Sequence, residues 1–219
     1  MKRAFFIVAC VLGSVVGAEE VSIDPQKGNN AFTALFDAKL GERISATSSS
    51  VGCELTFDEK AQTVSGTCSV PLTSIKVDNE DTKTEHFQQW TTNKKSDPKA
   101  CKLEAKLAGV KVGALAAQKP TAFTAEVAFT VCGRPRTDGA KEHLTGTAML
   151  FPPGSYGDQK TIRIRANIEH FNRAKYQIGP GFTEGWLSRV QSLAPVVAEE
   201  GTIDFSLFAH PKQAAPATH

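Results

Sequence analysis

The side chains best suited to acid–base chemistry are an adjacent carboxylate and imidazole, Glu85 and His86. Histidine titrates near neutral pH, so this pair could act as an acid and a base on a lipid-like substrate, or could anchor the polar end of a ligand. The simpler interpretation makes His86 a surface or capping residue of a helix. No segment matches the zinc-protease, serine-hydrolase, phosphate-loop, redox-cysteine or dinucleotide motifs, and the sequence therefore predicts no enzyme and no cofactor or metal site.

Arginines form the second candidate group. Arg134 and Arg136 flank a proline in one turn, and Arg163 and Arg165 share the polar face of a predicted strand. They could contact a lipid headgroup or a phosphate, or more simply pair with nearby glutamates in solvent. The whole chain has 25 Lys plus Arg against 23 Asp plus Glu, so it lacks the basic excess of a protein that binds nucleic acid by counterion release.

Cysteines carry the clearest covalent prediction. Segments 51–58 and 63–70 read as a hairpin about a polar turn, which places Cys53 opposite Cys68. This leaves Cys101 to pair with Cys132, on two further antiparallel segments. Their alternation puts the two residues on different faces, so the second bridge needs a bulge or a twist at a strand end. Structural zinc is disfavoured, because no two cysteines have the short spacing that it prefers.

The N-terminus predicts export. Residues 1–18 combine a basic start, an apolar core and small residues at the end, which is typical of a signal peptide cleaved after Ala18. An alternative is a lipoprotein signal that would leave an acylated Cys10. Export to an oxidising compartment, the periplasm or the exterior, suits an even number of remaining cysteines. We expect a barrel domain over 19–212 and a disordered tail over 213–219, with no stable membrane insertion since no other apolar run could span a bilayer.

The elements that must position these residues are strands. Six segments alternate apolar and polar residues with period two, and weaker candidates bring the total to about ten. The six are 51–58, 63–70, 100–107, 121–131, 161–170 and 202–209, and the weaker ones are 31–38, 43–49, 109–116 and 144–151. This pattern predicts an antiparallel all-β fold, and fits a sandwich as well as a barrel.

Two segments break the alternation and are predicted to be short helices. Residues 79–92 offer Asn79 or Asp81 as N-cap, and residues 183–194 offer Thr183 as N-cap and Pro195 as stop. A helix across the mouth of a barrel would bury its apolar side chains.

The alternation also predicts which side chains face the interior. Large apolar residues from five strands should converge there, small residues should leave space for a ligand, and two aromatic residues of the first helix should form a lid. His170 shares the inward parity of its strand. The candidate ligand-binding residues are Phe57, Phe87, Trp90, Leu103, Ala125, Phe129, Ile164, Ala166 and Phe205.

Several of these motifs, in this order, resemble the YceI family of lipocalin-like exported proteins that bind polyisoprenoid chains. The resemblance covers about residues 28–210, although the early histidine of the family is replaced by Asn29 and Asn30, and the four cysteines are additions. The matching segments are GCELTFD at 52–58, VPLTSI at 70–75, Glu85 with His86, Asp97 with Pro98, FTVCGRPR at 129–136 and NRAKYQIG at 172–179.

The resemblance implies an extended antiparallel barrel of eight strands whose apolar lumen takes an isoprenoid lipid, another long-chain lipid or an isoprenoid quinone. Each buried methylene contributes roughly 0.8 kcal/mol, so such a chain can be held without specific chemistry. Two alternatives remain open on the residues alone. One is a filled sandwich or barrel that presents its loops to a partner, and the other is an enzyme that uses Glu85 and His86.

Overall fold

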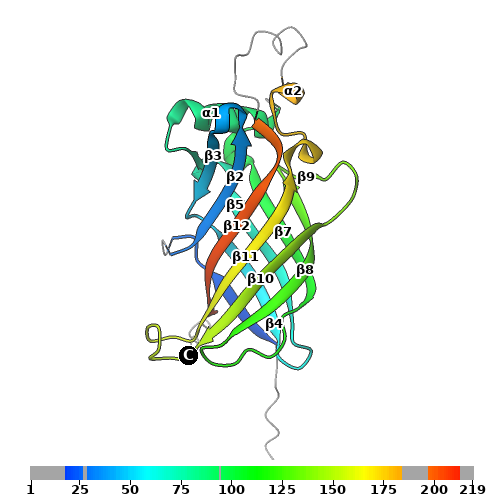
Figure 1. Cartoon of the computed structure of the whole chain (residues 1–219). Helices are drawn as coiled ribbons and strands as arrows, with labels where there is room; N and C mark the ends of the chain where they lie inside the picture. The colour runs from blue at the N-terminus through cyan, green and yellow to red at the C-terminus, as the bar shows by residue number, and fades with distance from the viewer. Residues whose placement is uncertain (1–17, 27–28, 94, 184–196, 213–219) are drawn as a thin grey trace, which may run out of the picture.

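An antiparallel β-barrel dominates the structure, which is a computed structural model describing residues 18–26, 29–93, 95–183 and 197–212 (Figure 1). Eight strands follow one another around the ring, each hydrogen bonded to the next. In order around the barrel they are β1 (Glu19–Ile23), β4 (Gly52–Asp58), β5 (Thr63–Pro71), β7 (Lys102–Lys111), β8 (Pro120–Val131), β10 (Glu142–Phe151), β11 (Thr161–Asn172) and β12 (Val197–Pro211). The barrel expectation is confirmed, and the sandwich alternative is wrong for this chain.

Strand β1 closes the ring, and the sequence pattern did not predict it. Val21 lies opposite Leu55 of β4 on one side and Pro211 of β12 on the other. Only Val21 and Ile23 of this short strand face the interior, too few residues for the alternation to be recognised.

Further strands widen the barrel at one end, called here the upper end. The upper part of β12 pairs with β2 (Ala31–Ala38), which pairs with β3 (Arg43–Ser48) and through it with β6 (Lys76–Val77). Helix α1 (Asp81–Thr92) lies across this end (Figure 1). The opposite, lower end carries the β4–β5 and β10–β11 turns. The short elements are β9 (Arg134–Pro135), α2 (Pro180–Thr183) and the 3-10 turns Lys39–Gly41, Leu72–Ser74, Pro98–Ala100 and Arg173–Tyr176.

Helix α1 confirms the first predicted helix but begins differently. Its N-cap is Glu80, not Asn79 or Asp81, and the side chain of Glu80 makes no capping hydrogen bond. Asn79 already has a left-handed backbone (φ 56°), so it belongs to the preceding turn. Asn93 ends the helix, also in a left-handed conformation.

The predicted alternation sorts the side chains of the barrel as expected. Along β8, Phe123, Ala125, Val127 and Phe129 are buried while Thr124, Glu126 and Ala128 are exposed. The buried residues of all eight strands join in one hydrophobic core. Residues 112–116 form no separate strand, because β7 ends at Lys111, so the expectation of a strand over 109–116 is wrong.

A bulge in β11 overturns the expected position of His170. The pairing with β12 shifts between Ile168 and Phe171, so the inward face passes from Ile168 directly to Phe171. His170 is therefore exposed, and its Nδ1 lies 2.7 Å from Glu200 Oε1 on the outside of the barrel. Opposite the bulge stands Gly201, where a Cβ would come within 2.3 Å of the Leu35 carbonyl oxygen, and only glycine fits.

Both predicted disulfides are present. Cys53 and Cys68 face each other in the β4–β5 register, with Cα atoms 4.1 Å apart. Cys101 and Cys132 are joined at strand ends, with Cα atoms 4.6 Å apart. Cys132 follows β8 in a left-handed conformation (φ 49°), which is the strand-end twist that the alternation required.

Some predictions fall outside the described residues. These are the signal peptide before Ala18, the second helix beyond Thr183 and the tail over 213–219. Within the described part of the chain, no helix is both long enough and apolar enough to cross a bilayer.

Candidate ligand-binding site

The upper end of the barrel encloses a cavity of about 510 Å³, called here the upper cavity. Strand β2 contributes three inward side chains to its wall, namely Phe32, Ala34 and Phe36, and β3 contributes Ile44 and Ala46. Its volume lies within the range of small-molecule sites, which are commonly about 300–1,000 Å³ and mostly apolar.

Helix α1 forms the roof of the upper cavity. Phe87 and Trp90 pack against the core from this helix, and the ring of His86 stacks on Trp90 with centroids 6.2 Å apart. The roof is fixed at both ends. The Val77 N–H donates to Thr84 Oγ1 at 3.0 Å near the start of the helix.

The other end of α1 is held by the predicted basic turn. The guanidinium of Arg134 donates to the carbonyl oxygen of Thr91, in the last turn of the helix, where a cation also suits the helix dipole. Its Nε donates to the carbonyl oxygen of Tyr176 at 3.3 Å. Burial lowers the pKa of Arg134 below its ordinary value. This arginine therefore has a structural partner on the roof and is not a free headgroup contact.

Two cationic side chains line the upper cavity among its apolar walls. Lys83 Nζ lies 2.9 Å from Asp78 Oδ2 and 3.0 Å from Glu80 Oε1, and these hydrogen bonds raise its pKa. Arg173 instead donates to three backbone carbonyl oxygens, those of Ala198, Ile178 and Val197, and burial lowers its pKa. Polar groups thus lie beside an apolar volume, as an amphiphile requires.

A stack of aromatic rings supports the wall of the upper cavity. Phe171, placed inward by the bulge, stacks on the buried Tyr176 with centroids 5.1 Å apart, and Phe129 meets both rings edge-on. The Tyr176 hydroxyl donates to Glu142 Oε1 at 2.6 Å, and the same oxygen accepts from Arg136 Nη1 at 2.9 Å. Burial, and then the bond to Glu142, raise the pKa of Tyr176.

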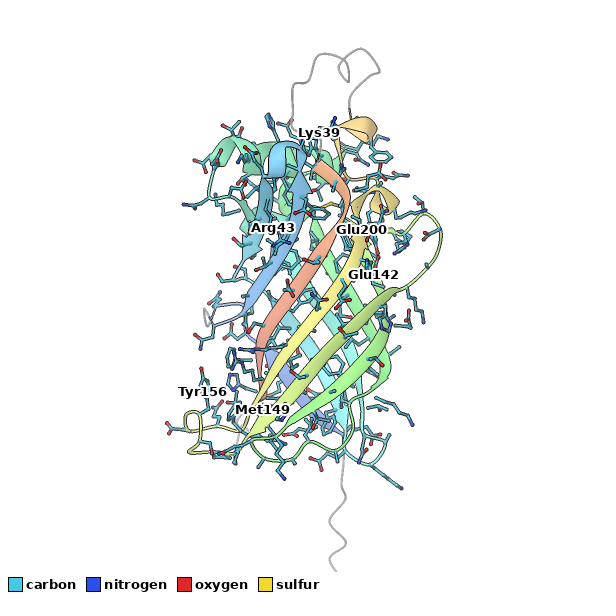
Figure 2. The ribbon with its side chains drawn as sticks, viewed as in Figure 1. Lys39, Arg43, Glu142, Met149, Tyr156 and Glu200 are labelled. Atoms are coloured by element: carbon cyan, nitrogen blue, oxygen red, sulfur yellow. A yellow bond between two sulfur atoms is a disulfide. The ribbon has the colours of Figure 1, made fainter. Side chains whose placement is uncertain are left out.

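Glu142 is only 2% exposed, so its charge depends on these two donors. It lies in the upper half of the barrel, as does Glu200, whereas Met149 and Tyr156 lie near the lower end (Figure 2). Arg136 also forms a two-pronged pair with Asp138, which lowers the pKa of that carboxyl group. The second arginine of the predicted turn is thus paired as well.

A second, smaller cavity of about 100 Å³ lies deeper in the barrel and is called here the lower cavity. Its lining is entirely apolar, with side chains from all eight strands of the ring. Phe57, Ile164, Ala166 and Phe205, four of the predicted interior residues, line it.

The other predicted residues are divided between the roof, the upper wall and the core. Phe87, Trp90 and Leu103 line the upper cavity. Phe129 borders a small void between the cavities. Ala125 is buried at 7% exposure but does not line either cavity.

Sequence reasoning missed several residues that line the upper cavity, among them the cations Lys83 and Arg173 and three phenylalanines. Phe32 and Phe36 belong to a strand that was recognised only weakly, although they alternate with Ala34 as an inward face should. Phe171 has the opposite parity to the rest of its strand. The only signal for it is the break itself, in which two polar residues follow Ile168 before the next apolar one.

The proposed acid–base pair does not form a compact catalytic centre. Glu85 and His86 are both exposed on α1, with the His86 ring turned to Trp90. Among the residues that the structure describes, no cluster of three or more His, Cys, Asp or Glu side chains could hold a metal ion.

Comparison with known proteins supports the fold. No protein-family model matches this sequence. No curated protein matches it either. The fold is similar to that of a solved polyisoprenoid-binding domain from Saccharophagus degradans implicated in plant cell wall breakdown, with a TM-score of 0.56. The two share 15% sequence identity over 88% of this chain and 98% of the other, so the likeness concerns the fold.

Proposed function

We propose that this protein binds a polyisoprenoid or similar long-chain amphiphile in its upper cavity, for transport or storage. The observation that carries the proposal is a cavity of about 510 Å³ with apolar walls and with Lys83 and Arg173 on its lining. An apolar tail gains free energy in proportion to the surface that it removes from water. The polar end of the ligand, an alcohol, a phosphate or a quinone ring, would remain near the cations.

The fold likeness supports this choice of ligand class. The solved domain with a similar fold is described as polyisoprenoid-binding. The motifs of this chain also resemble the YceI family. A filled-core interaction protein would need no interior volume of this size, since packed interiors leave few voids larger than a water molecule. We therefore favour the carrier over the interaction protein and over the enzyme.

We further propose that the carrier acts after export, in the periplasm or outside the cell. Two disulfides support an oxidising compartment. The barrel strand β1 begins at Glu19, directly after the expected cleavage site at Ala18, so processing there would leave every strand of the ring intact.

The test fills the upper cavity without touching the outside of the barrel. Ala34 lies on the upper wall at 6% exposure, so Ala34→Trp should occupy the space of the ligand. Ala128→Trp is the matched control, because Ala128 is exposed on the outer face of β8. The measurement is the lipid extracted from purified full-length protein, identified by mass spectrometry, together with thermal melting of each variant.

We expect the parent protein and Ala128→Trp to carry an isoprenoid lipid, and folded Ala34→Trp to carry at least about tenfold less, in line with blocked burial of the tail. A lipid-free parent that also fails to bind added polyprenols would refute the carrier. Chemical conversion of an added polyprenol, abolished by Glu85→Gln or His86→Gln, would support the enzyme instead.

A further inference from the structure

The interior of the barrel is divided into two compartments. Between the upper and lower cavities lies a void of only about 10 Å³, bordered by Phe32, Leu103, Phe129 and Phe205, which we call the aromatic partition. Phe32 and Leu103 also line the upper cavity, and Phe205 also lines the lower one. A void of this size holds about one water molecule at most, so no lipid chain passes through it.

The partition is built into the register of the sheet. Phe32 of β2 and Phe205 of β12 are directly paired across the two strands, and their rings pack with centroids 5.7 Å apart. Both side chains therefore project inward at the same level of the barrel. Phe32 is 1% exposed, and Leu103 reaches the same void from the opposite wall on β7.

We propose that the aromatic partition is a ruler that limits the isoprenoid chain to the upper cavity, so that this protein selects chains of about four isoprene units. The proposal rests on the function proposed above. A known reference is a 150 Å³ apolar cavity that holds benzene, which gives about 25 Å³ per carbon atom. By that measure the upper cavity of about 510 Å³ takes about 20 carbons, and an isoprene unit has five.

The ruler predicts how affinity depends on chain length. For linear polyprenols of two, three and four units, each added unit buries further apolar surface, and the affinity should rise by at least about tenfold per unit. Units beyond the fourth meet the partition and remain outside the cavity. Between four and eight units the affinity should therefore change by less than about twofold.

In the parent protein, the aromatic partition keeps the isoprenoid chain out of the lower cavity. Phe205→Ala would remove a ring between the two cavities and join to the upper one the lower volume of about 100 Å³. By the same volume per carbon, the gain is about four carbons, and the limit should move from about four units to about five.

Two further variants keep the test independent of folding. Truncating a Phe that packs against the core destabilises a protein, so Phe205→Ala is accompanied by a second variant, Ala34→Leu. The larger side chain reduces the volume of the upper cavity from its wall and should move the limit to about three units. Phe208→Ala is the matched control. Phe208 points outward on the same strand, against Tyr156, and its loss should leave the limit unchanged.

The experiment titrates full-length protein with polyprenols of two to eight units, and reads occupancy by native mass spectrometry and binding by tryptophan fluorescence. A limit at four units that moves up in Phe205→Ala or down in Ala34→Leu supports the ruler. Affinity in the parent that keeps rising to eight units overturns the ruler and leaves the carrier intact. Absence of binding at every length refutes the carrier and the ruler with it.

Discussion

At the scale of single residues, the hydroxyl of Tyr176 joins the wall of the upper cavity to a buried charge. The ring supports Phe171, while the hydroxyl donates to Glu142, a carboxylate that bulk water hardly reaches. Since burial and Glu142 raise the pKa of Tyr176, the hydroxyl stays protonated and remains a donor throughout the physiological range. The side chain of Tyr176 therefore contributes both to the wall of the upper cavity and to the stability of the fold.

Tyr176→Phe should lower the free energy of unfolding by about 1–3 kcal/mol, because Glu142 loses one of its two donors while buried. Urea unfolding measures the change. Tyr156→Phe is the control, since Tyr156 is 50% exposed and should be nearly neutral. Equal effects of the two substitutions would show that the hydrogen bond from the Tyr176 hydroxyl to Glu142 does not contribute to the free energy of unfolding.

His170 supplies a pH-dependent contribution on the outside of the barrel. Its hydrogen bond to Glu200, and then the charge of Glu200, raise its pKa above the ordinary value of 6.5. A raised pKa in the folded state means that the stabilisation is fully present below about pH 6.5 and is lost as the pH rises through the folded value. The pair lies in solvent, so this contribution is small.

We expect Glu200→Gln to shift the pKa of His170 back toward 6.5, as followed by its ring resonances in an NMR titration. The difference in stability between the parent and this variant should be larger at pH 5.5 than at pH 8.5. Glu126→Gln, which alters a similar pair with His143 elsewhere on the surface, should leave the His170 titration unchanged. A His170 pKa that is the same in all three proteins would contradict this account.

At the scale of elements, the two disulfides brace different parts of the barrel. The first joins neighbouring strands 15 residues apart in sequence, and the second spans 31 residues and lies next to the C-terminal end of α1. By the entropy of the loops that they close, they stabilise the fold by about 3 and about 4 kcal/mol respectively.

Replacing Cys101 and Cys132 by serine should therefore destabilise the protein slightly more than replacing Cys53 and Cys68. It should also weaken polyprenol binding, because Cys132 Sγ lies 3.5 Å from the Thr91 carbonyl oxygen, at the roof of the upper cavity. Paired denaturant unfolding and polyprenol titration of the two double variants make the comparison. Weaker binding in the Cys53/Cys68 variant alone would contradict the assigned roles.

How well the sequence predicts an element depends on its local regularity. The β4–β5 hairpin was predicted in register, down to its disulfide, since its alternation is unbroken and its turn is short. Strand β11 was predicted, but its bulge exchanges His170 for Phe171 on the inward face. The bulge is stabilised by the partner strand, where Gly201 leaves room between Phe36 and Phe171, and no local pattern in β11 encodes that contact.

At the scale of the whole molecule, the alternation alone cannot tell a barrel from a sandwich, because both bury one face of every strand. The difference lies in β1, whose five residues complete the ring. The side chains that the alternation assigns to the interior lie in the hydrophobic core or pack against it. Their division into two cavities depends on the level at which Phe32 and Phe205 meet, which follows from a pairing between strands far apart in sequence.

The closure of the ring by β1 also determines when the protein can fold and when it can take up a ligand. Val21 pairs with Pro211, so the ring cannot be completed on the ribosome until the last strand has been synthesised. Strand β12 also lines both cavities, with Ile203 in the upper one and Phe205 in the lower one, so neither cavity exists in a nascent chain that lacks this strand. A chain translocated before it folds would reach its destination empty. The protein would then bind its lipid in the compartment where the disulfides form, and the donor of that lipid would also be located there.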